Sequence, residues 1–166
     1  MQNREVRFTF NALPQSAADM AALPEAGLAT PFETAALFAA AMCRYPSNAA
    51  AAIEMVNLLK GPKPLNPYET QFLADRMRGK PYLPLSFFIG ATPANGYEPT
   101  KPYAIAVSEN PYSYQEESYA KLFLQSGGAD SPRPIQLRQA KDGKWYLWEQ
   151  FLLSDIRQPD TADPWA

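Results

Sequence analysis

The periodicity of the apolar residues changes once along the chain, near residue 81, and this change restricts the folds that the chain can adopt. Before residue 81 the apolar residues follow helical spacing, as on the buried face of an amphipathic helix. After it, apolar and polar residues alternate, which is typical of strands with one buried face. Helices followed by consecutive strands predict an α+β fold, with helices packed on one antiparallel sheet.

The helical half contains repeated start signals. "TPFETAALFAAAM" and "NPYETQFLADRM" each begin with a capping residue, a proline, an aromatic residue and a glutamate, the pattern of a capping box. An internal repeat would explain this likeness, but the similarity fades after the caps, which favours two independent helices. The first segment is apolar nearly all round and is expected to be the most buried helix. Helices are expected at 16–23, 30–42, 47–61 (capped by Ser47) and 66–77.

The strands predict an antiparallel sheet of about five members, including one from the N-terminus. "EVRFTF" alternates apolar and polar residues directly after the start of the chain. Three further candidates follow the helices, and the last stretch, "RPIQLRQAKDGKWYLWEQF", is a hairpin. Strands are expected at 5–10, 85–89, 103–109, 119–125 and, as the hairpin, within 133–151.

Asp142-Gly143 predicts the turn of that hairpin, because both central residues of a type I′ turn need positive φ. This turn pairs Leu137 with Trp148 and Ile135 with Gln150, and it directs Tyr146 and Trp148 toward the helices. The opposite face then carries Gln136, Arg138, Leu147, Glu149 and Trp145. Trp145 is left with two interpretations: it packs under a loop, or it is an exposed platform for a ligand.

The chain has 166 residues, enough for one domain at 1–166, with a helical half at about 12–80 and a sheet half at about 84–158. Fifteen basic and seventeen acidic residues leave a net charge of −2, which gives no basic surface for nucleic acid. No apolar run is long enough to cross a membrane. The N-terminus lacks the apolar core of a signal peptide, so the sequence favours the cytoplasm, although a trimmed signal stays an alternative.

Histidine is absent and Cys43 is the only cysteine, which removes most catalytic and metal chemistry. Without histidine there is no Ser-His-Asp triad and no Cys-His pair. No phosphate-binding or dinucleotide-binding glycine motif and no calcium loop occurs. Cys43 lies in an apolar helix pattern, which indicates a buried thiol without reactivity. The sequence therefore predicts no catalytic residue, no metal and no cofactor.

The best candidate for a ligand site outside the core is "SGGADSPRP" (126–134). Gly127-Gly128 could present backbone amides there, and Arg133 could hold a carboxylate or phosphate. The same residues also make an ordinary connection between two strands. "GATPANGYEP" (90–99) allows the same two interpretations. The candidate ligand-binding residues are Asp130, Arg133, Tyr97 and Trp145.

Three segments together, "GATPANGYEPTKPY", "NPYSYQEESYAKLFLQSGGADSPRPIQLRQ" and "KWYLWEQFLLSDIRQP", resemble a family of bacterial proteins, mostly from gut-type anaerobes, that is known as a domain of unknown function. The resemblance implies a bacterial origin and a compact domain, and it implies no activity or site residue. A weaker analogy, based on element order alone, is to domains of the nuclear-transport-factor-2 type, in which helices pack on a curved sheet.

Three functions are compatible with these observations. The first is a non-enzymatic module that binds another protein, because tyrosine and proline are frequent in the sheet half. The second is a small-molecule-binding domain or enzyme with a pocket between sheet and helices. The third is a structural domain that assembles through exposed strand edges. The first is preferred, since the catalytic constellations are absent.

Overall fold

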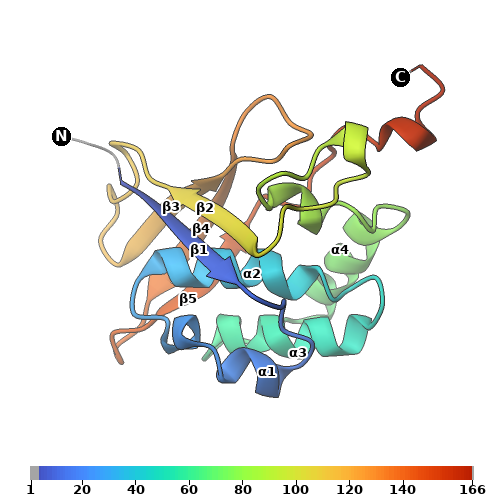
Figure 1. The fold of residues 1–166 in the computed structure, drawn as a ribbon. Coiled ribbons are helices and arrows are strands. Elements are labelled where there is room, and N and C mark those ends of the chain that lie inside the picture. The colour runs from blue at the N-terminus through green and yellow to red at the C-terminus, as the bar shows by residue number, and fades with distance from the viewer. Residues whose placement is uncertain (1–3, 166) are drawn as a thin grey trace.

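The computed structural model describes residues 4–165, in which helices come first and strands mostly follow (Figure 1). This order confirms the α+β fold with an N-terminal strand. Four short 3₁₀ helices lie in the connections, at Pro24–Gly27, Pro84–Phe87, Pro93–Asn95 and Asp160–Ala162. The main elements are β1 (Glu5–Phe10), α1 (Ala17–Ala21), α2 (Pro31–Met42), α3 (Ala49–Lys60), α4 (Pro67–Met77), β2 (Tyr103–Ser108), β3 (Tyr119–Leu124), β4 (Arg133–Gln139) and β5 (Trp145–Gln150).

The five strands form one antiparallel sheet in the order β1-β2-β3-β4-β5. Each strand after the first pairs with the one before it in the chain, although β1 and β2 are separated by the whole helical half. The order leaves β1 and β5 as the two edge strands. An edge strand has backbone groups on its outer side that the sheet itself does not pair.

Helix α2 lies between the sheet and a second helical layer that contains α1 and α3 (Figure 1). It packs against all five strands. Eleven of its twelve residues are buried, the exception being Glu33. A helix enclosed on every side must be apolar all round, and this confirms the expectation that it is the most buried.

Capping boxes begin α2 and α4, as the sequence predicts. The Glu69 amide donates to Asn66 Oδ1 at 2.7 Å, and Glu69 Oε1 accepts from the Asn66 amide at 3.1 Å. The Glu33 carboxylate accepts from the Thr30 amide at 3.0 Å in the same way. Helix α3 begins one residue later than predicted, because its N-cap is Asn48 and not Ser47.

The prediction of a strand at 85–89 is wrong. Residues Pro84–Phe87 form a 3₁₀ helix, in which proline occupies the first helical position. Phe87 and Phe88 are both buried, so the apolar run fills the core without alternating between two faces. Only Ile89 makes strand-like bonds: its amide donates to the Ala104 carbonyl at 2.8 Å, and its carbonyl accepts from the Thr100 amide at 3.0 Å.

The chain doubles back at Gly143 as predicted, but the register next to the turn is wrong. Lys141 and Asp142 are the central residues of a β-turn, in which the Gly143 amide donates to the Ala140 carbonyl at 2.9 Å. Gly143 follows with φ of 84°. This is the arrangement of a three-residue hairpin loop, which shifts the pairing by one residue relative to a two-residue turn.

The shifted register reverses which residues of β5 are buried. Leu137 faces Leu147, and both are buried, whereas the prediction paired Leu137 with Trp148. A β-bulge at Trp148 then absorbs one residue, and the pairing of Ile135 with Gln150 is as predicted. Trp148 consequently lies outside the core, with 38% of its surface exposed.

No helix within residues 4–165 is long and apolar enough to span a lipid bilayer.

Candidate functional site

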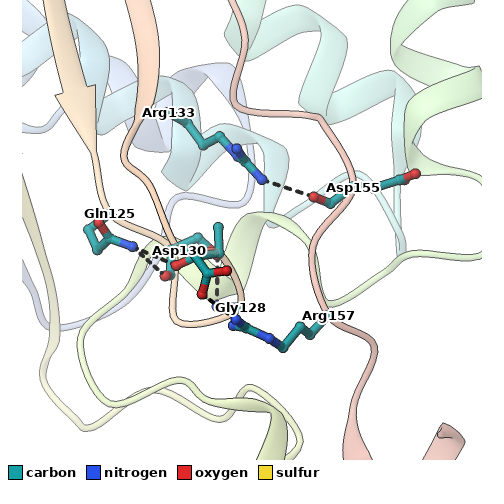
Figure 2. A network of polar contacts seen from close by, with 8 residues as sticks. Gln125, Gly128, Asp130, Arg133, Asp155 and Arg157 are labelled. Carbon is teal, nitrogen blue, oxygen red and sulfur yellow. Dashed lines mark hydrogen bonds and ion pairs between the residues drawn. The ribbon is translucent and has the colours of Figure 1, made fainter.

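Three of the four predicted ligand-binding residues, Tyr97, Asp130 and Arg133, contact the C-terminal segment after β5. The Tyr97 hydroxyl donates to the Arg157 carbonyl, and the Tyr97 ring stacks on Tyr82 with 5.2 Å between centroids. Burial and the neighbouring Tyr82 raise the pKa of Tyr97. Asp130 forms an exposed ion pair with the Arg157 guanidinium (Figure 2). These contacts attach the C-terminal segment to the two loops that the sequence singled out.

The glycine pair in the 126–134 connection has its amides already bonded. The Gly127 amide donates to the Ser86 carbonyl at 2.8 Å, and the Gly128 amide donates to Ser126 Oγ at 3.1 Å. A Cβ atom on Gly128 would lie 2.0 Å from the Tyr97 hydroxyl oxygen. Glycine is needed here because two segments approach each other closely, and the amides are not presented to a ligand.

Arg133 lies at the start of β4 and reaches the same C-terminal segment. Its Nη2 donates to the Asp155 carbonyl oxygen at 3.0 Å (Figure 2). Its Nε is buried and has no hydrogen-bond partner among the described residues. A buried donor without a partner is rare in folded proteins, and it is often explained by a ligand, ion or water.

Trp145 lies at the other end of the hairpin. Its amide donates to the Leu28 carbonyl at 3.0 Å, and its own carbonyl accepts from Thr34 Oγ1 at 2.6 Å. The half-buried ring packs against the core. Its partner in β4, Gln139, is six residues from Arg133, roughly 20 Å along the strand. The four predicted residues therefore do not meet in one place, and their contact with a ligand stays a prediction.

A groove lies between α4 and β5, in the space between helices and sheet where one sequence hypothesis placed a pocket, but the sequence did not predict the residues that line it. It has a volume of about 370 Å³ and is called here the α4–β5 groove. Its floor consists of core residues, and its two walls are α4 and the outer part of β5. The floor includes Phe38, Val56, Leu73 and Leu147; the α4 wall includes Tyr68, Glu69, Phe72 and Arg76; the β5 wall runs from Leu147 to Phe151.

Aromatic side chains surround the α4–β5 groove. Tyr68 is 78% exposed, Phe151 47% and Trp148 38%, although all three are large and apolar. Phe72 lies between them on α4. Exposed aromatic side chains that gather around one groove are typical of surfaces that bind a partner or a ligand.

Positive charges lie over these aromatic rings. The Lys63 ammonium is 5.2 Å from the centroid of Trp148, and the Arg138 guanidinium is 5.3 Å from it on the sheet side. Arg76 lies 4.8 Å from the centroid of Phe72. Such cation–π contacts hold the side chains of the rim in place and bring cations to a wall that also carries Glu149.

One ion pair lies in the groove wall. Lys60 is buried, with 5% of its side chain exposed, and its Nζ lies 3.2 Å from Glu69 Oε2. Burial, the largest single effect, raises the pKa of Glu69, but the Asn66 amide and the Lys60 ammonium together bring it below its ordinary value. Lys60 and Glu69 therefore neutralise each other, and the groove lining between them stays mostly apolar.

Sequence reasoning did not predict the residues that line the groove, because it placed Trp148 in the core. A detectable signal was present in "NPYETQFLADRM", where Tyr68 and Phe72 are four residues apart and so share one face of α4. None of the predicted strands was expected to pack against that face of the helix. The groove became visible only once the bulge at Trp148 and the position of α4 were known.

Metal and thiol chemistry find little support among the described residues. Among residues 4–165 no cluster of histidine, cysteine, aspartate or glutamate could hold a metal ion. The Cys43 thiol donates to the Ala39 carbonyl at 3.3 Å, and burial raises the pKa of that thiol. A thiol kept protonated in this way is a poor nucleophile.

The chain was compared with curated proteins, solved structures and models of protein families. No curated protein and no solved structure matches it. A family model matches residues 12–160, a stretch that holds all of α1–α4 and β2–β5. The match covers most of the chain. It agrees with the resemblance to a domain of unknown function that was expected from the sequence. The chain belongs to the family described as Domain of unknown function (DUF6935).

Proposed function

We propose that this domain is a non-enzymatic module that binds another protein through the α4–β5 groove. The observation that supports the proposal is the aromatic rim of Tyr68, Phe72, Trp148 and Phe151 around an apolar floor. Tyrosine and tryptophan are enriched at binding hot spots, since they provide rigid contact area and a polar group at low entropic cost. An apolar floor excludes water from the contacts made above it.

The alternative, a small-molecule site or enzyme with a pocket between sheet and helices, has weaker support. The α4–β5 groove does lie between the sheet and the helices, but Tyr97, Asp130, Arg133 and Trp145, the residues expected to bind a ligand, do not line it. The other alternative, assembly through strand edges, involves β1 and β5, and a strict monomer in light scattering would count against it.

Several expectations from the sequence belong to the same proposal and stay predictions. They are a single domain over 1–166, a bacterial and cytoplasmic protein, and the analogy to domains of the nuclear-transport-factor-2 type. A ligand role for Tyr97, Asp130 and Trp145 is also untested.

The proposal is tested by selection from a phage-displayed library of short random peptides. Peptides recovered on the wild-type domain are synthesised and titrated against two variants, Tyr68→Ala and Tyr112→Ala, by fluorescence anisotropy. Both tyrosines are exposed, at 78% and 66%, but Tyr112 does not line the groove. Tyr68→Ala is expected to weaken binding about tenfold, as for a hot-spot residue, and Tyr112→Ala to leave it unchanged.

Two results would overturn the proposal. One is that no peptide is enriched on the wild-type domain over a blank surface. The other is that every enriched peptide binds both variants as tightly as the wild type, because the contacts would then lie elsewhere. Thermal unfolding of both variants establishes that a loss of binding is not a loss of fold.

A further inference from the structure

The α4–β5 groove continues into a second, basic hollow. This hollow has a volume of about 200 Å³ and shares Phe72, Arg76, Gln150 and Phe151 with the groove. Its remaining lining residues are Arg133, Pro134, Leu153 and Ser154. We call it the arginine hollow, because two arginines and no aspartate or glutamate line it. A ligand that extends along the groove therefore passes from an apolar region into a cationic one.

The positive charge of the arginine hollow is only partly compensated. Asp155, next to it, forms an ion pair with Lys80, and its carbonyl accepts from Arg133. The pKa of Asp155 is lowered, first by Lys80 and further by Arg76. The Asp155 carboxylate thus faces two cations, Lys80 and Arg76, because Arg133 bonds to the backbone carbonyl of that residue. The Nε of Arg133, whose side chain borders the hollow, is buried and has no hydrogen-bond partner among the described residues.

The β5 wall of the groove belongs to an edge strand of the sheet. Five consecutive residues, Leu147 to Phe151, line the groove. The bulge at Trp148 interrupts the alternation of side chains between the two faces, so all five residues border the groove, and β5 is an edge strand whose outer side no other strand pairs. The bonds of Trp145 with Leu28 and Thr34 cover the edge only at its start.

A sheet edge beside a helix is suited to an extended peptide. The main chain of such a peptide adds to the edge as a further strand, and alternate side chains enter the space between strand and helix. The five residues from Leu147 to Phe151 extend over roughly 17 Å, which matches a peptide of about five residues. A small free acid would fill only one end of this length.

We infer that the α4–β5 groove binds an extended acidic peptide of a partner protein. Its main chain pairs with the outer edge of β5, an apolar side chain fills the groove, and a carboxylate binds Arg76 and Arg133 in the arginine hollow. This inference rests on the proposed function and adds the chemistry of the partner. The charge of the hollow is what selects an acidic peptide over a neutral or basic one.

The same peptide library, selected in parallel on variants, tests the inference. Arg76→Gln removes a cation of the hollow. Arg78→Gln is its matched control, because Arg78 is the C-cap residue of the same helix, pairs with Asp75 and lines neither the groove nor the hollow. Peptides selected on the wild type and on Arg78→Gln are expected to be enriched in aspartate and glutamate. Peptides selected on Arg76→Gln and Arg133→Gln are expected to lose that enrichment.

Titrations with one selected peptide identify the contacts. Replacing its glutamate or aspartate by the amide residue is expected to weaken binding about tenfold on the wild type and much less on Arg76→Gln. An amidated C-terminus distinguishes a side-chain carboxylate from a terminal one.

Methylation of alternate backbone amides is expected to abolish binding, since it blocks strand pairing. Circular dichroism checks the fold of Arg133→Gln. If Arg133→Gln unfolds, Arg76→Gln alone tests the inference, because Arg76 is exposed.

The results separate this inference from the proposed function. Peptides that need Tyr68 but show no acidic enrichment would overturn the inference and leave the proposed function intact. Peptides that ignore Tyr68 would overturn both. If 3-phenylpropionate binds as tightly as the peptide, and loses affinity on Arg76→Gln, the hollow is a site for small free acids, and the peptide is excluded.

Discussion

Gly128 is a residue whose identity is determined by a contact distant in the sequence. A side chain there would meet the Tyr97 hydroxyl at 2.0 Å and Ile156 Cβ at 3.2 Å. Its φ is not in the left-handed region, so a larger residue is excluded by space and not by backbone conformation. Sequence analysis marked the glycine pair as a turn or an anion site, because nothing local indicates that residues 97 and 156 pass beside it.

Gly128→Ala is therefore expected to lower the free energy of unfolding by about 1–3 kcal/mol, the usual effect of overpacking. Gly27→Ala is the control, because a Cβ at Gly27 meets nothing within 4 Å and its φ is also outside the left-handed region. That variant is expected to change stability by less than about 1 kcal/mol, with a slight gain if any. Urea denaturation measures both, and equal losses would contradict the packing argument.

Helix α4 shows what the sequence determines at the level of an element. Its N-terminal capping box was predicted from four consecutive residues, and Asn66 and Glu69 form it as expected. The register of the β4–β5 hairpin was not predicted, because a two-residue and a three-residue loop both suit Asp-Gly. Asp142 favours the longer loop by accepting bonds from the Lys144 amide at 2.9 Å and the Tyr146 hydroxyl at 2.7 Å.

Glu69 connects the start of α4 to buried Lys60, so its titration affects stability. Because folding lowers its pKa, the folded state binds fewer protons than the unfolded state in acid. The stabilisation is present above pH 4.5, the ordinary pKa of the group, and is lost as the pH falls through the lower pKa of the folded state. Denaturation curves between pH 7 and about 3 are expected to show this loss in the wild type.

Glu69→Gln is expected to make that pH dependence shallower. It is also expected to lower stability at pH 7 by about 1–3 kcal/mol, because Lys60 stays buried without its charged partner. Asp75→Asn breaks an exposed pair with Arg78, the C-cap residue of the same helix, and is expected to change stability by less than about 0.5 kcal/mol. If both variants lowered the free energy of unfolding equally, the ion pair between Lys60 and Glu69 would contribute nothing to stability beyond an exposed pair.

At the scale of the whole molecule, α2 joins the helical and sheet halves through one core. The change of periodicity near residue 81 predicted two halves and an antiparallel sheet, and both are present. It could not predict where α4 would lie, since only Leu73 and Met77 of that helix are buried. The candidate groove depends on this placement, so the fold was more predictable than the site.

This difference in burial predicts unequal protection from hydrogen exchange. Amides in α2, β3 and β4 are expected to exchange only when the whole molecule unfolds. Amides in α4 are expected to exchange through a local opening of lower free energy, because that helix buries few side chains. Native-state exchange by NMR at increasing denaturant measures both. The prediction would be contradicted if the amides of α2 and α4 exchanged with the same free energy of opening and the same dependence on denaturant.

The position of β5 at the end of the strand order has a consequence for how recognition would proceed. A guest strand docking there would widen the sheet without displacing any bond between existing strands. The host would not need to melt, swap segments or rearrange its interior to accept it. Association could then be fast and reversible, and its strength could change through rim substitutions while the scaffold stays intact.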